Sequence, residues 1–398
     1  MLHMRPTRPI YLDNQATTPC DPRVVEAMLP YFTERFGNPH SAGHALGHEA
    51  ETAVEAARAE IAALIGADPR EIILTSGATE ANNLAIKGAA RHRRAFGGPA
   101  RVVTVATEHK CVLESVAALA GEGFETEILP VGADGRLDPD VLRAALAAPT
   151  ALVSVMAVNN ETGVVQDIAA FAAIARAAGA LFHTDLAQAG GKIPLDIAAI
   201  GADLASLSAH KMYGPKGVGA LYVRRRPRVR LAPLFSGGGQ ERGLRSGTLP
   251  VPLIVGFGTA CRLAREEMAA ESARLAGLRE RLFAALDSFI PGLRRNGPAA
   301  CIPGGLHLTF PAVPALALIA ALPELCVSTG SACSSAEIET SYVLRAMGMS
   351  NAEAARSLRL CVGRYTSAAD VDYAARALCD AHARLAAHDA GATAQVEA

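Results

Sequence analysis

One lysine stands where a probable strand ends, among side chains that can assist a reactive amine. Lys211 follows the apolar run 202–207 in the sequence SAHKMYGPKG, with a serine and a histidine just before it. About one strand–helix unit upstream, Asp185 and Gln188 stand in the sequence HTDLAQ. A lysine beside a glycine–proline turn would by itself indicate a surface residue. The acid, the amide and the histidine together favour a reactive amine instead.

This combination meets the chemical needs of pyridoxal phosphate. A lysine amine forms a Schiff base with the cofactor's aldehyde, and a buried acid keeps the pyridine nitrogen protonated so that the ring accepts electrons. The sequence therefore predicts Lys211 as the amine and Asp185 as the acid.

The sequence TSGATE at 75–80 offers a place for a phosphate. It lies between a predicted strand at 71–75 and a predicted helix at 79–92. Glycine permits the turn, and the first N–H groups of a helix, with small hydroxyls beside them, can bind an anion. An ordinary helix cap with Glu80 explains the pattern equally well. No Gly-Lys-Ser/Thr follows, which disfavours a nucleotide-hydrolysing P-loop.

Three further polar residues accompany predicted strands. His109, in TEHK, could stack on a cofactor ring, or it could be a surface histidine at a helix start. Asn160, in VNNETG, could donate to a substrate carboxylate or to the ring's phenolic oxygen, or simply form a turn. Arg359, in the apolar strand SLRL, could bind a carboxylate or form a structural ion pair.

A cysteine and a glycine-rich loop complete the candidate site. Cys333 stands among small residues in GSACSS, where a thiol can be exposed enough to act as a nucleophile. Cys361 and Cys326, by contrast, stand in apolar strands and are predicted to be core residues. The loop 237–248 either reaches a phosphate, across a subunit interface, or is a mobile linker.

Composition narrows the class of protein. Half of the 398 residues are hydrophobic, 19% are charged, and the net charge is −1, so no overall field would recruit nucleic acid or an anionic membrane. The arginines at 224–230 are interpreted as a solvated loop. No apolar run is long enough for a membrane span. Eight cysteines without a C-x-x-C pair argue against disulfides or a zinc site and favour a cytoplasmic protein.

Predicted strands and helices alternate through the first two thirds of the chain, which predicts an α/β fold with a largely parallel sheet covered on both faces. A long amphipathic helix at 252–289 is predicted to connect this part to a smaller unit, and the end from residue 390 is expected to fray. The predicted strands lie at 71–75, 101–106, 151–155, 180–183, 202–207, 306–310, 325–328 and 357–362, and the other helices at 79–92, from 110, and at 168–178, 314–322, 342–347 and 368–386.

The motifs and their order resemble those of cysteine desulfurases of the IscS/NifS group, in the class V pyridoxal-phosphate-dependent aminotransferase superfamily. The resemblance extends from Tyr11 to about Ala386 and rests on TSGATE, TEHK, VNNETGVVQ, HTDLAQ, SAHKMYGPKG, GGGQERGLRSGT and GSACSS. It implies the fold-type I architecture: a large domain at 17–262 with a mainly parallel, seven-stranded type of sheet flanked by helices. A smaller α+β domain, at 1–16 and 263–398, would carry a mobile cysteine loop.

The resemblance also implies a role for each site residue. Lys211, His109 and Cys333 would be catalytic, with Cys333 as sulfur acceptor, able to ligate a cluster transiently but with no resident metal. Asn160 and Arg359 would bind the substrate carboxylate. The implied cofactor-binding residues are Ala78, Thr79, His109, Asn160, Asp185, Gln188, Ser208, His210, Lys211 and, from the other subunit, Thr248.

The implied reaction converts L-cysteine to L-alanine and leaves a persulfide on Cys333, in a homodimer that passes sulfur to an acceptor or iron–sulfur scaffold protein. A selenocysteine lyase or another class V transaminase is the alternative enzyme, and a catalytically silent scaffold is the alternative class. The chain departs from the family's pattern at its short, alanine-rich end, which lacks the aromatic segment that docks the scaffold.

Overall fold

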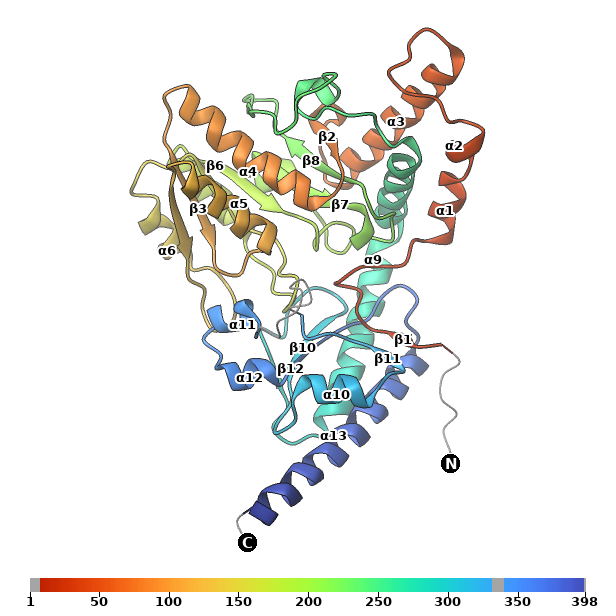
Figure 1. Cartoon of the computed structure of the whole chain (residues 1–398), viewed down its shortest axis with the longest axis vertical. Coiled ribbons are helices and arrows are strands. Elements are labelled where there is room, and N and C mark those ends of the chain that lie inside the picture. Colours follow the sequence, from red (N-terminus) through yellow and green to blue (C-terminus); the bar gives the residue numbers. More distant parts are fainter. Residues whose placement is uncertain (1–7, 331–339, 397–398) are drawn as a thin grey trace.

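A twisted seven-stranded sheet forms the centre of the larger part of the molecule. The computed structural model describes residues 8–330 and 340–396, and within them the sheet has the strand order β2-β8-β7-β6-β5-β3-β4 (Figure 1). β8 runs antiparallel to both neighbours, and the other strands are parallel to one another. The strands are β2 (Ile72–Thr75), β3 (Arg101–Val105), β4 (Glu125–Leu129), β5 (Leu152–Ser154), β6 (Leu181–Asp185), β7 (Leu204–Ser208) and β8 (Gly219–Val223).

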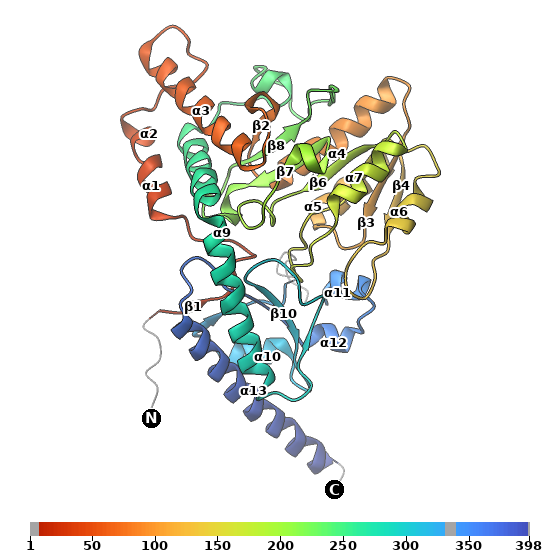
Figure 2. The same cartoon turned by 180° about the vertical axis from the view of Figure 1, so that it is seen from behind.

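Both faces of this sheet are apolar and covered by helices. Side chains alternate between faces along a strand, so that Ile73 packs with α4 (Ala78–Ala95) and α5 (Lys110–Gly121). Its neighbours Ile72 and Leu74 join the opposite cluster, which α3 (Ala45–Leu64), α7 (Ile168–Ala177) and α9 (Val251–Asp287) also help to form. Figure 1 shows α4 and α5 in front of the sheet, and Figure 2, from behind, shows α7 and α9.

A smaller part lies at one end of the molecule and has its own core. An antiparallel sheet of order β12-β10-β9 and a parallel β1–β11 pair lie beside α10 and α13. The strands are β1 (Ile10–Tyr11), β9 (Arg294–Arg295), β10 (Gly305–Thr309), β11 (Leu325–Cys326) and β12 (Ser357–Cys361). The other helices are α1 (Pro22–Met28), α2 (Pro30–Thr33), α6 (Pro139–Ala145), α8 (Ile197–Ile200), α10 (Ala315–Ala321), α11 (Tyr342–Ala346), α12 (Asn351–Ala355) and α13 (Ala368–Val396).

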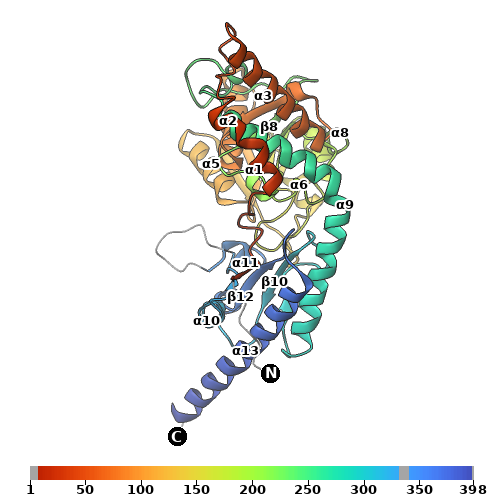
Figure 3. The same cartoon turned by 90° about the vertical axis from the view of Figure 1, so that its right-hand side faces the viewer.

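The long helix α9 belongs to both cores. Ile254 and Phe257, in its first turns, are buried against the large sheet, whereas Leu278 and Leu282 are buried in the small core. Figure 3 shows α9 running along one side from the large part into the small one. The helix therefore couples the two cores through its backbone.

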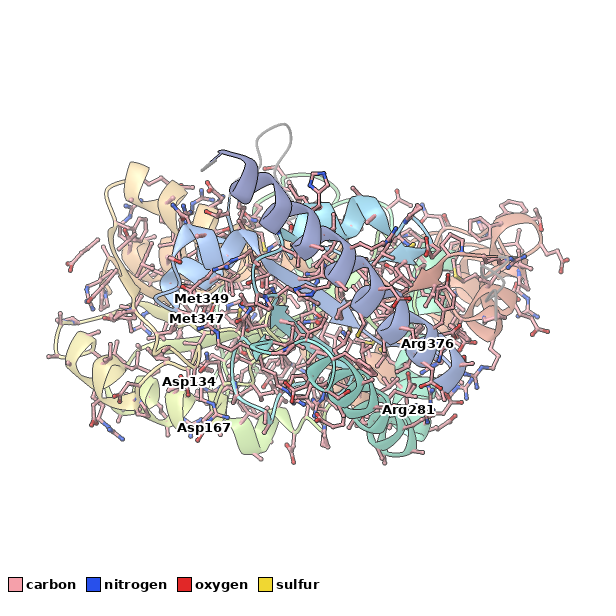
Figure 4. The ribbon with its side chains drawn as sticks, turned by 90° about the horizontal axis from the view of Figure 1, so that it is seen from below. Asp134, Asp167, Arg281, Met347, Met349 and Arg376 are labelled. Atoms are coloured by element: carbon pink, nitrogen blue, oxygen red, sulfur yellow. The ribbon has the colours of Figure 1, made fainter. Side chains whose placement is uncertain are left out.

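The underside of the molecule shows how α13 packs against α9. α13 crosses α9 there, and Arg281 of α9 forms a two-pronged ion pair with Asp372 of α13, at 2.6 Å. Figure 4 shows this face, with Arg281 and Arg376 on these helices and Met347 near Asp134. Met347 packs against the turn at Gly135, so that the small part also contacts the loop after β4.

The predicted α/β class and the mainly parallel sheet are confirmed, and the predicted long helix is α9. Four strands were missed. β1 and β9 have only two residues each, β4 is a polar edge strand, and β8 begins with a glycine directly after a turn. The expected fraying from residue 390 is wrong, because α13 continues to Val396. Cys326 was predicted to be a core residue but is only half-buried, whereas Cys361 is buried as predicted.

The sequence also predicted domain limits and the absence of a membrane span. The domain limits at 262 and 263 stay a prediction, and they fall inside α9. No helix among residues 8–330 and 340–396 combines the length and the apolar character that a membrane crossing requires.

Candidate active site

A cavity of about 560 Å³ opens where β6 and β7 end and α4 begins. This is the carboxyl edge of the parallel strands, where α/β folds bind ligands. Ten of the residues predicted for the site line it: Ala78, Thr79, His109, Asn160, Asp185, Gln188, Ser208, His210, Lys211 and Arg359. Thr248 is exposed and lies outside this lining, and Cys333 lies outside the described residues.

Lys211 reaches into the cavity from a single 3-10 turn (Ala209–Lys211) that follows β7. Its amine donates to the carbonyl oxygens of Gln15 at 2.6 Å and Ala16 at 2.7 Å. The segment that supplies these carbonyls is far away in sequence, and Thr18 ties it to the lysine turn by donating to the carbonyl of His210 at 2.9 Å. These two backbone oxygens thus hold the amine at the cavity wall.

Asp185 ends β6 with its side chain buried and both carboxylate oxygens occupied. One oxygen accepts from the amide of Asn82 at 2.7 Å, and the other accepts from the backbone N–H of Ala187 at 2.8 Å. These two contacts fix the orientation of the carboxyl group at the cavity wall.

The surroundings of His109 define which ring nitrogen carries its proton. The backbone N–H of Cys111 donates to His109 Nδ1 at 3.1 Å, so the proton of the neutral ring is on Nε2. Burial lowers the pKa of His109, which keeps the ring neutral near pH 7. Burial also raises the pKa of the neighbouring Cys111 thiol to about 12. Cys111 is therefore an inert thiol, 3.0 Å from Nδ1.

The first turn of α4 provides the predicted anion site. Gly77 precedes the helix with φ of 153°, and a Cβ on Gly219 would lie 2.6 Å from the Gly77 Cα, so both positions require glycine. The N–H groups of Ala78 and Thr79 begin an 18-residue helix, whose dipole favours an anion there. The alternative cap interpretation also holds, since Glu80 accepts from the backbone N–H of Ser76 at 2.8 Å.

His210, next to Lys211, also lines the cavity and is also neutral. Burial, followed by the nearby Lys211, lowers its pKa to about 4. Its Nδ1 lies 3.0 Å from the hydroxyl of Thr17. The imidazole can therefore serve this site as a neutral hydrogen-bonding group rather than as a cation.

Arg359 combines the two roles that the sequence left open. Its Nη2 donates to Asp13 at 2.7 Å, so the structural ion pair exists, and its Nη1 donates to the carbonyl of Asn160 at 2.9 Å. Its buried Nε–H has no acceptor among the described residues. The Nε–H of the guanidinium is thus available for an anion in the cavity.

Buried polar atoms without partners test whether a polar ligand fits here. Among the described residues, Gln15 Oε1, Asn160 Oδ1 and Arg359 Nε are all buried and unpaired, and all three residues line this cavity. Such atoms are costly unless a bound group or water satisfies them. A ligand with both anionic groups and hydrogen-bond donors fits this set, as pyridoxal phosphate with an amino acid does.

The glycine-rich loop is fixed at one point and exposed at another. Glu241 is buried and accepts from two nitrogens of Arg58, at 2.7 and 2.8 Å, and from the backbone N–H of Leu74 at 2.7 Å. Arg245 pairs with Glu80 at 2.9 Å, beside the start of α4. The loop is thus anchored to β2 and α4, while Thr248 is exposed and does not belong to the lining of this chain's cavity.

Sequence reasoning missed several residues that support the site. Gln15 and Asp13 lie in the N-terminal segment at which the resemblance to the family begins, and Asn82 is one of two adjacent asparagines on α4. Nothing in the sequence around Cys111 or Lys192 indicated a role in the site. The contacts of Cys111 with His109 and of Lys192 with Gln188 are defined only by the folded backbone.

Comparisons with known proteins agree with this geometry. A family model described as aminotransferase class-V matches residues 10–374. A cysteine desulfurase IscS from Anaeromyxobacter sp. (strain Fw109-5) is 57% identical, over 92% of this chain and 91% of its own. A cysteine desulfurase from Mus musculus is 54% identical, over 92% of this chain and 80% of its own.

Solved structures give the same result for the fold. One described as a NifS-like protein superposes with a TM-score of 0.87 at 36% identity, covering 94% of this chain and 98% of the other. Another, described as SspA in complex with cysteine, gives 0.79 at 38% identity, covering 90% and 99%.

These matches first define the class: the chain belongs to the aminotransferase class-V family of pyridoxal-phosphate-dependent enzymes. Within that family, the predicted kinship with the cysteine desulfurases of the IscS/NifS group is confirmed, since relatives of that name are 52% to 57% identical over most of the chain.

Proposed function

We propose that this protein is a cysteine desulfurase, which removes sulfur from L-cysteine to give L-alanine and a persulfide on Cys333. The observation that carries the proposal is the single cavity that gathers Lys211, Asp185, His109 and Arg359, in a chain 57% identical to a cysteine desulfurase IscS. Pyridoxal phosphate, when bound, supplies an aldehyde for amines and an electron-accepting ring.

The residues of this chain divide the task of holding the cofactor. The N–H groups at the start of α4, with Ser208 and His210, would hold the phosphate. Asp185 would pair with the ring nitrogen, and Gln188 would donate to the phenolic oxygen. The face of His109 would stack on the ring. The resemblance to the cysteine desulfurases implies these assignments, and the position of each residue in the cavity lining supports them.

Other residues would act on the substrate. The unpaired Nε–H of Arg359 and the Asn160 amide would bind the carboxylate of cysteine, which places its amine near Lys211. Lys211, once released from the cofactor, would take the α proton, since its amine is a base held by neutral carbonyls. The Nε2–H of the neutral His109 ring would donate a hydrogen bond to a group in the cavity.

Sulfur transfer then requires a nucleophile. The Cys333 thiolate would attack the substrate sulfur, so that the carbon–sulfur bond breaks and a sulfur–sulfur bond forms, while the displaced carbon accepts a proton. Cysteine plus a thiol becomes alanine plus a persulfide, which balances without an external oxidant or reductant. A sulfur-acceptor or iron–sulfur scaffold protein would receive the persulfide sulfur.

The proposal includes a homodimer and a reducing compartment such as the cytoplasm. A predicted trans role for Thr248 explains why it is exposed and outside this chain's cavity. The seven cysteines among the described residues are all free, which suits reducing conditions.

Two variants test the function together. Lys211→Ala is expected to lose the visible absorbance of covalently bound cofactor, because Lys211 is the amine proposed to hold the cofactor and Lys216, which also lines the cavity, is not. Cys333→Ala should keep that absorbance but lose alanine production from cysteine and persulfide labelling. A transaminase would stay active without Cys333, and purified protein that gains no absorbance with added pyridoxal phosphate would contradict the proposal entirely.

A further inference from the structure

A second lysine lies one hydrogen bond behind the cavity. Lys192 donates from Nζ to the side-chain oxygen of Gln188 at 2.9 Å. The nitrogen of the same amide donates to the carbonyl of Gln15 at 2.8 Å, and that carbonyl also accepts from Lys211 at 2.6 Å. One chain of hydrogen bonds therefore joins the two lysine amines through Gln188 and Gln15.

These hydrogen bonds fix which end of the Gln188 amide faces Lys192 and which end faces Gln15. In the reverse orientation the amide N–H groups would face the donor Lys192, and the amide oxygen would face the acceptor Gln15. Both contacts would then be repulsive. With the observed orientation, the amide nitrogen has a second N–H, which is the donor that Gln188 can offer to an oxygen in the cavity.

The backbone around Lys192 makes this contact specific. Gly190 and Gly191 turn the chain back after Gln188, and a Cβ on Gly190 would lie 2.7 Å from the Met212 side chain. Gly191 has φ of +70°, which glycine adopts readily. Ser272 of α9 donates to the carbonyl of Lys192 at 2.8 Å. The lysine is thus placed by a turn and by a long helix, not by a mobile loop.

Lys192 is separated from the reactive cavity. Its side chain lines a second, internal cavity of about 20 Å³, which is room for one water molecule, together with Asn14, Glu271 and Cys361. Among the described residues, Gln188 is its one side-chain hydrogen-bond acceptor. Burial lowers the pKa of the Lys192 amine. The residue has no access to substrate, so its effect on the reaction must pass through its neighbour.

We propose that Lys192 is a positioning residue, which holds Gln188 so that its amide N–H is directed at the phenolic oxygen of the cofactor. This inference rests on the cofactor named in the proposed function. A donor on the amide oxygen also polarises the amide and strengthens the hydrogen bond that its nitrogen donates. Lys192 thereby favours the anionic form of the phenolic oxygen without touching it.

A double-mutant cycle tests whether Lys192 acts on cofactor binding through Gln188. Lys192→Met is expected to weaken pyridoxal phosphate binding to the apoprotein about 10-fold and to shift the absorbance maximum of the bound cofactor at saturation. In a Gln188→Ala background, the same substitution should change binding less than about twofold, because its target is gone. Lys87→Met, at another half-buried lysine away from the cavity, is the control.

The possible outcomes separate the two proposals. Equal losses from Lys192→Met in both backgrounds, or an unchanged absorbance maximum, would mean that the residue is merely structural and would overturn the inference. If Lys192→Met fails to fold, as judged by the melting of the apoprotein, Lys192→Gln provides the same cycle with a polar side chain. Wild-type protein that binds no pyridoxal phosphate would instead refute the proposed function.

Discussion

At the scale of single residues, the site is built from neutral histidines and one fixed carboxylate. His109 and His210 are both kept neutral by burial, which lowers the pKa of each. Asp185 is held in place by two N–H donors. It is thus the carboxylate available for a ring nitrogen, since Glu80, which also lines the cavity, is paired with Arg245. The cationic side chains of the lining are Lys211, Lys216 and Arg359.

Asn82 supports Asp185 from a position outside the cavity. Asn82→Ala is expected to weaken pyridoxal phosphate binding about 10-fold, since a charge-assisted hydrogen bond contributes about 1.5–3 kcal/mol. Binding would be measured by titrating the apoprotein with cofactor. Asn83→Ala is the matched control, because the neighbouring Asn83 donates only to the carbonyl of Thr79. Equal affinities for the two variants would show that the Asn82 contact is dispensable.

At the scale of elements, the order of strands and helices was predictable, whereas the contacts between distant elements were not. Apolar runs and glycine turns predicted β2, β3 and α4, because burial on both faces of a sheet leaves a strong pattern. Arg359 was marked by its place in an apolar strand, but nothing in the sequence marked Asp13 as its partner, because their ion pair joins positions 346 residues apart. A pairing of this kind follows from the fold and cannot be obtained from local sequence.

The site residues were predicted in a similar way, from polar side chains that follow apolar strands. Most of its residues directly follow a strand, and the carboxyl ends of parallel strands lie at one edge of a sheet. The placement of His109 and Lys211 at that edge therefore followed from the predicted order of strands and helices. The carbonyls of Gln15 and Ala16 that hold Lys211 were missed, because backbone acceptors leave no mark in the sequence.

A histidine inside the central sheet makes the stability of the strands depend on pH. His183 of β6 lies 2.8 Å from the hydroxyl of Ser154 on β5 and 3.0 Å from that of Ser206 on β7. Burial lowers its pKa to about 3, well below the value of about 6.5 in an unfolded chain. Its stabilising contribution is therefore complete above about pH 6.5 and is lost as the pH falls toward 3.

This dependence can be measured by urea unfolding. Between pH 7.5 and 5.5, His183 should account for a loss of about 1.4 kcal/mol in the free energy of unfolding. His183→Asn should remove that part of the pH dependence, whereas His40→Asn, at an exposed position, should leave it unchanged. A His183→Asn protein with the wild-type pH dependence would contradict the assignment.

At the scale of the whole molecule, the proposed site draws on two chains. Mixed dimers of Lys211→Ala with Thr248→Ala subunits test this. If Thr248 acts across the interface, one site in each mixed dimer has both residues intact, and the dimer should have about half of the wild-type activity. If Thr248 acts within its own chain, neither site is intact.

The matching homodimers supply the controls for that experiment. The Lys211→Ala homodimer should be inactive, and the Thr248→Ala homodimer should bind cofactor more weakly than wild type, because it loses a phosphate contact. Mixed dimers no more active than the average of these two homodimers would rule out a role across the interface.

The pairing of β1 with β11 has a consequence for synthesis. Ile10 pairs with Leu325, so the first strand of the chain has no partner until most of the protein has left the ribosome. The large sheet is complete once β8 has emerged, and it can collapse around α3 and α4 while the small core still lacks β10 and β12. The nascent chain must therefore hold its N-terminal strand unpaired. A chaperone bound to that strand during translation would prevent it from pairing with the wrong edge.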